Sequence, residues 1–157
     1  MGGIPSSGGS LHGFLFLLIF PDAKIDSLFF MVVSKSVLLI GLDPLLIDFT
    51  KGGYPVGMNA EKVIAGVDSS IQQLTTLGYT VDFCSIDFGE TAEQVLRTKL
   101  AQGTWDCIMI GAGIRLNPSN FLLFEKVVNV VHECASSSKI SFNELPSDTK
   151  NAVMRWV

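Results

Sequence analysis

Residues 37–41 read VLLIG, an uninterrupted apolar run that ends in a glycine, and residues 107–111 repeat this pattern as CIMIG. A strand that is apolar along its whole length is buried on both faces, as are the central strands of a parallel sheet. Both runs therefore predict central strands. The glycine at the end of each run predicts a tight turn or a close backbone approach.

Two further strands are expected outside this pair. Residues 79–87 alternate apolar and polar side chains, which is typical of a strand with one wet face at the edge of a sheet. Residues 140–142 form a short apolar segment between Lys139 and Asn143 and predict a fourth strand.

Helical patterns separate these strands, at residues 59–78, 91–103, 118–135 and 147–157. Each pattern begins with a residue type that favours the N-terminal cap of a helix. The expected caps are Asn59, Thr91 in a capping box with Gln94, Asn117 before Pro118, and Ser147. Strands that alternate with helices predict an α/β fold with parallel pairing and right-handed crossovers. We expect three layers, with a sheet of about four strands in the order 2-1-3-4.

The 157-residue chain is long enough for one domain, which we place at residues 31–157. Residues 1–30 are interpreted as an extension that is poorly ordered or docked on a surface groove. Its apolar run at residues 14–20 follows no basic residue and is too short for a membrane span, so no span is expected. The net charge of −4, without a basic stripe, argues against nucleic-acid binding.

The cysteines are Cys84, Cys107 and Cys134, and they form no CxxC pair and no zinc-like spacing. Neither a disulfide framework nor a metal site is predicted. Reduced cysteines in apolar strands behave as small hydrophobic residues, which favours a reducing, cytoplasmic location.

A ligand site is expected where strands 37–40 and 107–110 end, because ligands bind at the carboxyl ends of parallel strands where the winding changes direction. Arg115, beside the start of the third helix, predicts a small anionic ligand. The ligand-binding candidates are Gly41, Asp43, Gly111, Gly113, Arg115, Asn117 and Ser119. The alternative is that the glycines form tight turns only. The long connection 43–58 is either a functional lid or a helical turn that plugs the top of the sheet.

The segments GLDP, DFGETAEQV, GAGIRLNPSNFLLFEKVVNVVHE and ISFNELPSDTKNAVMRW follow or surround the expected strands. In them the chain resembles small flavodoxin-like proteins of uncharacterised activity over about four-fifths of its length. Its plan is also similar to response-regulator receiver domains. A receiver has an acidic pair after its first strand and a phosphoacceptor aspartate after its third, whereas this chain has only Asp43 and Gly111 there. The resemblance implies the fold and no phosphorylation chemistry.

Three functions are open from the sequence. The first is a noncatalytic ligand-binding or regulatory module with its site at the strand ends. The second is a small enzyme in which Asp43 acts as general acid or base on an anion held by Arg115. The third is a protein-interaction module that forms a homodimer through the third helix or the edge of the fourth strand, unless residues 11–20 cover that surface. The cofactor is unknown, and whether the chain is an enzyme is open.

Overall fold

The computed structural model describes residues 34–51 and 54–157. The chain divides into two units, residues 1–32 and 33–157, and the account below concerns the second. The expected N-terminal extension, its apolar run and its suggested docking lie outside the described residues.

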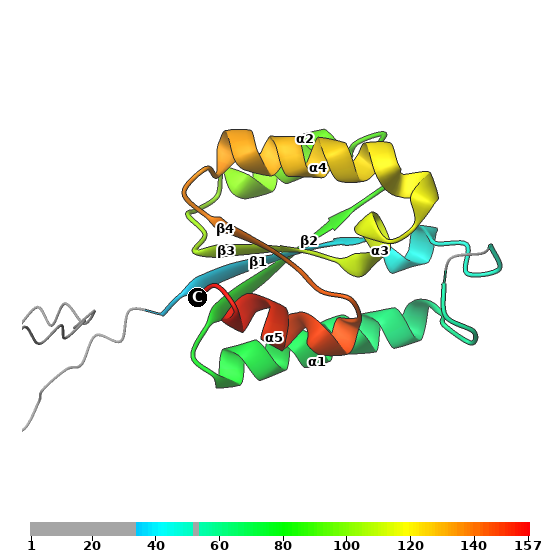
Figure 1. Ribbon diagram of the computed structural model, residues 1–157, viewed down its shortest axis with the longest axis horizontal. Helices are drawn as coiled ribbons and strands as arrows, with labels where there is room; N and C mark the ends of the chain where they lie inside the picture. The colour runs from blue at the N-terminus through cyan, green and yellow to red at the C-terminus, as the bar shows by residue number, and fades with distance from the viewer. Residues whose placement is uncertain (1–33, 52–53) are drawn as a thin grey trace, which may run out of the picture. The chain divides into compact units, whose positions relative to one another are not determined.

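Four parallel strands form one sheet in the order β2-β1-β3-β4, which confirms the predicted order (Figure 1). The strands are β1 (Ser36–Leu42), β2 (Thr80–Ile86), β3 (Cys107–Ile110) and β4 (Lys139–Phe142). In the register, Val37 lies opposite Val81 of β2 and Cys107 of β3. The two strands that contain the apolar runs 37–40 and 107–110 are the two central ones.

Helices cover both faces of the sheet (Figure 1). α1 (Ala60–Thr76) and α5 (Thr149–Met154) lie on one face, and α2 (Ala92–Leu100) and α4 (Phe121–Cys134) lie on the other. Leu38 and Ile40 belong to the core under α2 and α4, whereas Val37 and Leu39 belong to the core on the α1 side. Alternate side chains of β1 thus enter different cores, which explains why residues 37–40 of the strand are all apolar.

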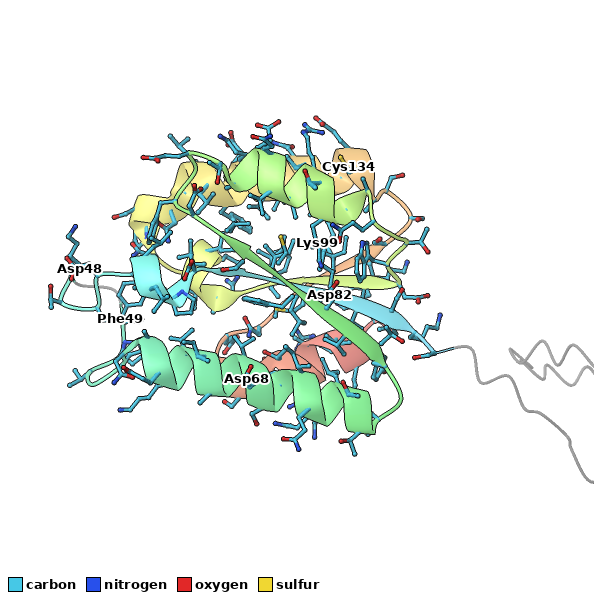
Figure 2. The ribbon with its side chains drawn as sticks, turned by 180° about the vertical axis from the view of Figure 1, so that it is seen from behind. Asp48, Phe49, Asp68, Asp82, Lys99 and Cys134 are labelled. Carbon is cyan, nitrogen blue, oxygen red and sulfur yellow. The ribbon has the colours of Figure 1, made fainter. Side chains whose placement is uncertain are left out.

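The edge strand β2 differs from its prediction in two respects. It covers Thr80–Ile86 rather than residues 79–87, and its polar face is partly covered by α2. Lys99 of α2 forms an ion pair with the half-buried Asp82 (Figure 2). The hydrogen bond from Lys99 lowers the pKa of Asp82 below its usual value. The edge position itself is confirmed.

The predicted caps have different outcomes. Asn59 caps α1 as expected, since its side chain accepts a hydrogen bond from the Lys62 backbone N–H at 3.0 Å. The Thr91 capping box is wrong, because Thr91 makes no side-chain cap bond. The carboxylate of Asp87 accepts the Thr91 and Ala92 backbone N–H groups instead, and the same carboxylate accepts the Gly89 N–H.

The helices predicted at residues 118–135 and 147–157 are both shorter in the structure. The segment expected as one helix at 118–135 is preceded by α3 (Ala112–Arg115) and opens with a 3-10 turn, η2 (Pro118–Asn120), before α4 begins. Asn117 caps η2 by accepting from the Ser119 N–H. The final helix begins after the turn η3 (Pro146–Asp148) and ends at Met154, before the C-terminus. The predicted cap Ser147 is wrong, because Ser147 lies inside η3 and Asp148 precedes the helix.

Candidate functional site

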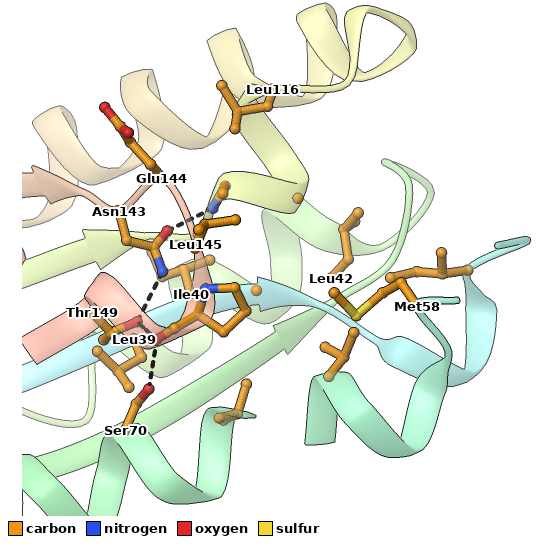
Figure 3. Close-up of a pocket in the computed structure, with 18 of the residues that line it drawn as sticks. Leu39, Ile40, Leu42, Met58, Ser70, Leu116, Asn143, Glu144, Leu145 and Thr149 are labelled. Carbon is orange, nitrogen blue, oxygen red and sulfur yellow. Dashed lines mark hydrogen bonds between the residues drawn. The ribbon is translucent and has the colours of Figure 1, made fainter. Parts of the chain in front are cut away.

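A cavity of about 260 Å³ lies at the carboxyl ends of β1 and β3 (Figure 3). The tight turn predicted at Gly41 is wrong, because β1 continues through Gly41 to the buried Leu42. The chain turns after β3 at Gly111, and α1 forms the opposite wall of the cavity with Val63 and Val67. The cavity therefore lies at the edge of the sheet where the switch in winding predicts a ligand site.

The cavity wall is apolar for most of its surface. The side chains of this wall come from β1, β2 and β3, from the β1–α1 connection, from α1 and α3, and from the segment after β4. The apolar side chains of the wall are Leu39, Ile40, Leu42, Ile47, Phe49, Pro55, Met58, Val63, Val67, Phe83, Met109, Ala112, Leu116, Leu145 and Pro146. A wall of this kind excludes charged ligands from the interior and favours apolar ones.

The polar groups at the back of the cavity already have protein partners (Figure 3). The Asn143 Oδ1 accepts from the Ala112 backbone N–H at 2.8 Å, and its Nδ2 donates to the Thr149 Oγ1 at 2.8 Å. The Thr149 hydroxyl donates to the carbonyl of Pro146, as does the Ser70 hydroxyl at 3.0 Å. This network joins the end of β4 to α3, η3 and α1, and it satisfies these buried groups without a ligand.

The mouth of the cavity combines two aromatic rings with an amide. The rings of Phe49 and Tyr54, both from the β1–α1 connection, pack with centroids 5.4 Å apart and planes at 59°. The Asn117 Nδ2 donates to the Tyr54 hydroxyl at 3.5 Å across the mouth. Leu116 and Leu145 also line the cavity and are 53% and 54% exposed, so the apolar surface continues from the interior to the rim.

The glycines predicted for the site, Gly41, Gly111 and Gly113, all line the cavity. A Cβ at Gly111 would lie 3.0 Å from the carbonyl oxygen of Ile40, because the backbones of β1 and β3 approach each other closely there. The close-approach interpretation of Gly111 is therefore sufficient to explain this glycine. Gly113 has more space, since its nearest neighbour is the Leu42 side chain at 3.9 Å.

Asp43 does not line the cavity. Its carboxylate caps the short 3-10 turn η1 (Pro44–Leu46) by accepting from the Leu45 N–H at 2.9 Å. Its own backbone N–H donates to the carbonyl of Ile86, which ties the end of β1 to β2. The helical turn that was suggested to plug the top of the sheet is present as η1, but its residue Leu45 is 77% exposed and plugs nothing. Further along the same connection, Ile47 and Phe49 do reach the cavity wall.

The guanidinium of Arg115 is bonded to the backbone just after β4. Its Nη2 donates to the backbone carbonyl of Asn143 at 3.0 Å, and its guanidinium lies 5.7 Å from the centroid of the Phe142 ring. Within residues 34–51 and 54–157, no hydrogen bond or ion pair joins Arg115 to Asp43. Of the polar candidates, only Asn117 lines the cavity, while Ser119 is exposed and donates its N–H to Asn117.

The cavity lining contains no lysine or arginine among the described residues. Its one ionisable acid is Glu144, whose carboxylate points away from Leu145 and from the cavity in Figure 3. The structure thus brings together the expected glycines and Asn117, but it does not bring a cationic side chain to them.

Sequence reasoning missed most of the apolar wall and the buried Asn143. The unusual length of the 43–58 connection was a usable signal, because Ile47, Phe49, Tyr54 and Met58 all reach the cavity from it. No signal in the sequence marks Asn143 as buried, since an asparagine after a strand is also typical of an exposed turn.

No group of three His, Cys, Asp or Glu side chains in the described part of the chain is placed to hold a metal ion. None of the helices that the structure describes is long and apolar enough to cross a membrane. Comparison with protein-family models, with curated proteins and with solved structures finds no match for this chain.

Proposed function

We propose that this protein is a noncatalytic binding module that holds a small apolar ligand in the cavity at the carboxyl ends of β1 and β3. The observation that carries the proposal is an apolar cavity of about 260 Å³ whose buried side-chain amide and hydroxyls already bond to the protein. Water in such a cavity has few partners, so an apolar ligand that displaces it loses little and gains apolar contact.

The size of the cavity limits the ligand. An apolar protein cavity of about 150 Å³ accommodates benzene, so 260 Å³ suits a molecule with on the order of ten non-hydrogen atoms. At about 0.6 kcal/mol of binding free energy per non-hydrogen atom, a value between those of the smallest ligands and of drug-sized ones, such a molecule would bind with a Kd on the order of 10–100 μM.

The apolar wall favours this ligand class over the anion expected from the sequence. An anion in the cavity would be desolvated without a cationic side chain beside it, which is costly. The enzyme alternative also has less support, because Asp43 caps η1 and Arg115 bonds to the carbonyl of Asn143.

The test uses naphthalene as probe, with equilibrium dialysis of the full chain. Val67 lines the cavity from α1, whereas Ile64 on the same helix does not. We expect naphthalene to bind the wild type, Val67→Phe to abolish binding by filling the cavity, and Ile64→Phe to leave the affinity unchanged. Absence of binding to the wild type, or equal affinity in both variants, would refute the proposal.

A homodimer is the second proposal, and one feature of α4 favours it. Phe121 and Leu122, in the first turn of the helix, are 62% and 74% exposed, and exposed apolar residues of this kind often mark contacts. Leu122→Glu is then expected to convert a dimer into a monomer in sedimentation equilibrium. A wild-type monomer at micromolar concentration would refute the dimer.

The proposed compartment is the cytoplasm. It is supported by three free thiols, of which Cys84 and Cys107 are buried in the strands. Mass spectrometry of the protein from its native cells should detect all three thiols in reduced form. The likeness to flavodoxin-like and receiver proteins stays a prediction from the sequence.

A further inference from the structure

We propose that the ligand of the cavity is an uncharged apolar molecule that carries a hydrogen-bond-accepting oxygen, such as the carbonyl of a ketone or ester, which Tyr54 and Asn117 hold at the mouth. This inference rests on the proposed binding function and specifies its ligand class. The inference is based on how the hydrogen-bond donors of Tyr54 and Asn117 are oriented at the mouth of the cavity.

The amide of Asn117 has a fixed orientation. Its Oδ1 accepts from the Ser119 backbone N–H at 3.0 Å, as the cap of η2, so the oxygen is directed away from the mouth. Its Nδ2 is therefore the atom that faces Tyr54, to which it donates at 3.5 Å. An amide nitrogen has two hydrogens, and a bond of this length leaves room for a ligand oxygen to compete for them.

The hydroxyl of Tyr54 is also a donor at this site. Its oxygen accepts from the Asn117 Nδ2, and within the described residues its own hydrogen is donated to no protein atom. The Phe49 ring packs against the Tyr54 ring and restricts where the hydroxyl can lie. Two donors thus converge at the mouth, and the acceptor of the amide is already occupied by Ser119.

This arrangement selects an acceptor rather than a donor. A ligand N–H that enters the mouth would meet two acceptors that are already engaged, because the Tyr54 oxygen accepts from the Asn117 amide and the Asn117 Oδ1 accepts from the Ser119 N–H. A carbonyl oxygen would accept from both groups while the apolar remainder of the molecule lies against Leu39, Val67 and the other apolar walls. A carboxylate could also accept, but its negative charge would be desolvated beside an apolar wall.

The experiment compares two probes of nearly the same shape, 2-acetylnaphthalene and 2-ethylnaphthalene, by equilibrium dialysis. Tyr54→Phe removes one donor, and Asn117→Asp removes the N–H group while it keeps an acceptor for Ser119. Tyr79→Phe is the matched control, because the Tyr79 hydroxyl donates to the carbonyl of Val157 and does not line the cavity.

Tyr54→Phe should weaken the binding of the ketone by about two- to twelvefold, the usual worth of one neutral hydrogen bond. Asn117→Asp should also weaken it. The affinity for 2-ethylnaphthalene should stay unchanged in both variants, and Tyr79→Phe should change neither probe. Equal effects on the two probes, or an unchanged ketone affinity, would overturn the acceptor inference and leave the binding function intact. If neither probe binds the wild type, the proposed function itself is wrong and the inference falls with it.

Discussion

Replacement of Asn143 tests whether its side chain holds the cavity together. Asn143 is 4% exposed, and its amide makes two hydrogen bonds of 2.8 Å, one to the Ala112 N–H and one to the Thr149 Oγ1. Asn143→Ala removes both. The Ala112 N–H then loses its partner, whereas the Thr149 hydroxyl keeps its bond to the carbonyl of Pro146.

The expected cost is worked from these partners. Two hydrogen bonds contribute about 1 kcal/mol each, and an N–H group left without a partner adds about 1–2 kcal/mol. Asn143→Ala should therefore lower the free energy of unfolding by about 3–4 kcal/mol. The matched control is Asn120→Ala, because Asn120 is 5% exposed and its side chain makes one hydrogen bond, to the carbonyl of Gly113. That variant should cost about 1–2 kcal/mol.

Urea denaturation followed by circular dichroism measures both values. The slope with denaturant should be the same in the wild type and the variants, so that the midpoints report stability. A loss below about 1 kcal/mol for Asn143→Ala would refute the reasoning. A loss no larger than that of Asn120→Ala would refute it as well. The affinity for naphthalene should also fall in Asn143→Ala, because the side-chain bonds that hold Ala112 and Thr149 in the cavity wall are lost.

Three further predictions concern residues outside this network. The Gly89, Thr91 and Ala92 bonds hold the pKa of Asp87 below its usual 3.8, so its contribution to stability is present above pH 3.8 and lost as pH falls through the lower folded value. Asp87→Asn should therefore reduce the loss of unfolding free energy that occurs as the pH falls below 3.8, and an unchanged pH dependence would contradict the role of Asp87 as the cap of α2. Burial raises the pKa of Cys84 to about 11, whereas Cys134 is exposed, so a thiol reagent at pH 8 should label Cys134 alone until the protein is unfolded. Rapid labelling of Cys84 in the native state would show that β2 is less well covered than described. Gly111→Ala should destabilise the fold by about 1–3 kcal/mol in thermal denaturation, because its Cβ meets the carbonyl oxygen of Ile40 at 3.0 Å; a wild-type melting temperature would mean that β1 and β3 separate easily.

The sheet could be predicted because its evidence is local. Successive side chains of a strand face opposite sides of the sheet, so a run of four apolar residues is apolar on both sides. The runs at 37–40 and 107–110 were therefore expected to be central strands, buried on both faces. The alternating run in β2 and the short β4 then had to lie outside them, and the parallel pairing followed from the helices between strands. The cap of α1 at Asn59 was equally local, since the cap and the N–H that it accepts are three residues apart.

The chemistry of the site depended on contacts that the sequence does not contain. Arg115 looked available for an anion until the fold placed the carbonyl of Asn143, 28 residues away, within 3.0 Å of its guanidinium. Asp43 looked like a candidate acid until the turn η1 used its carboxylate as a cap.

The sequence by itself determined the strands, their order and the edge of the sheet where a site is expected, because hydrophobic periodicity and chain connectivity are properties of neighbouring residues. Only the tertiary structure decided that this edge holds an apolar cavity with no lysine or arginine among its described lining residues. Its wall is assembled from segments between β1 and η3, and whether a polar group such as Asn143 is free or satisfied is known only when its partner from another segment is in place.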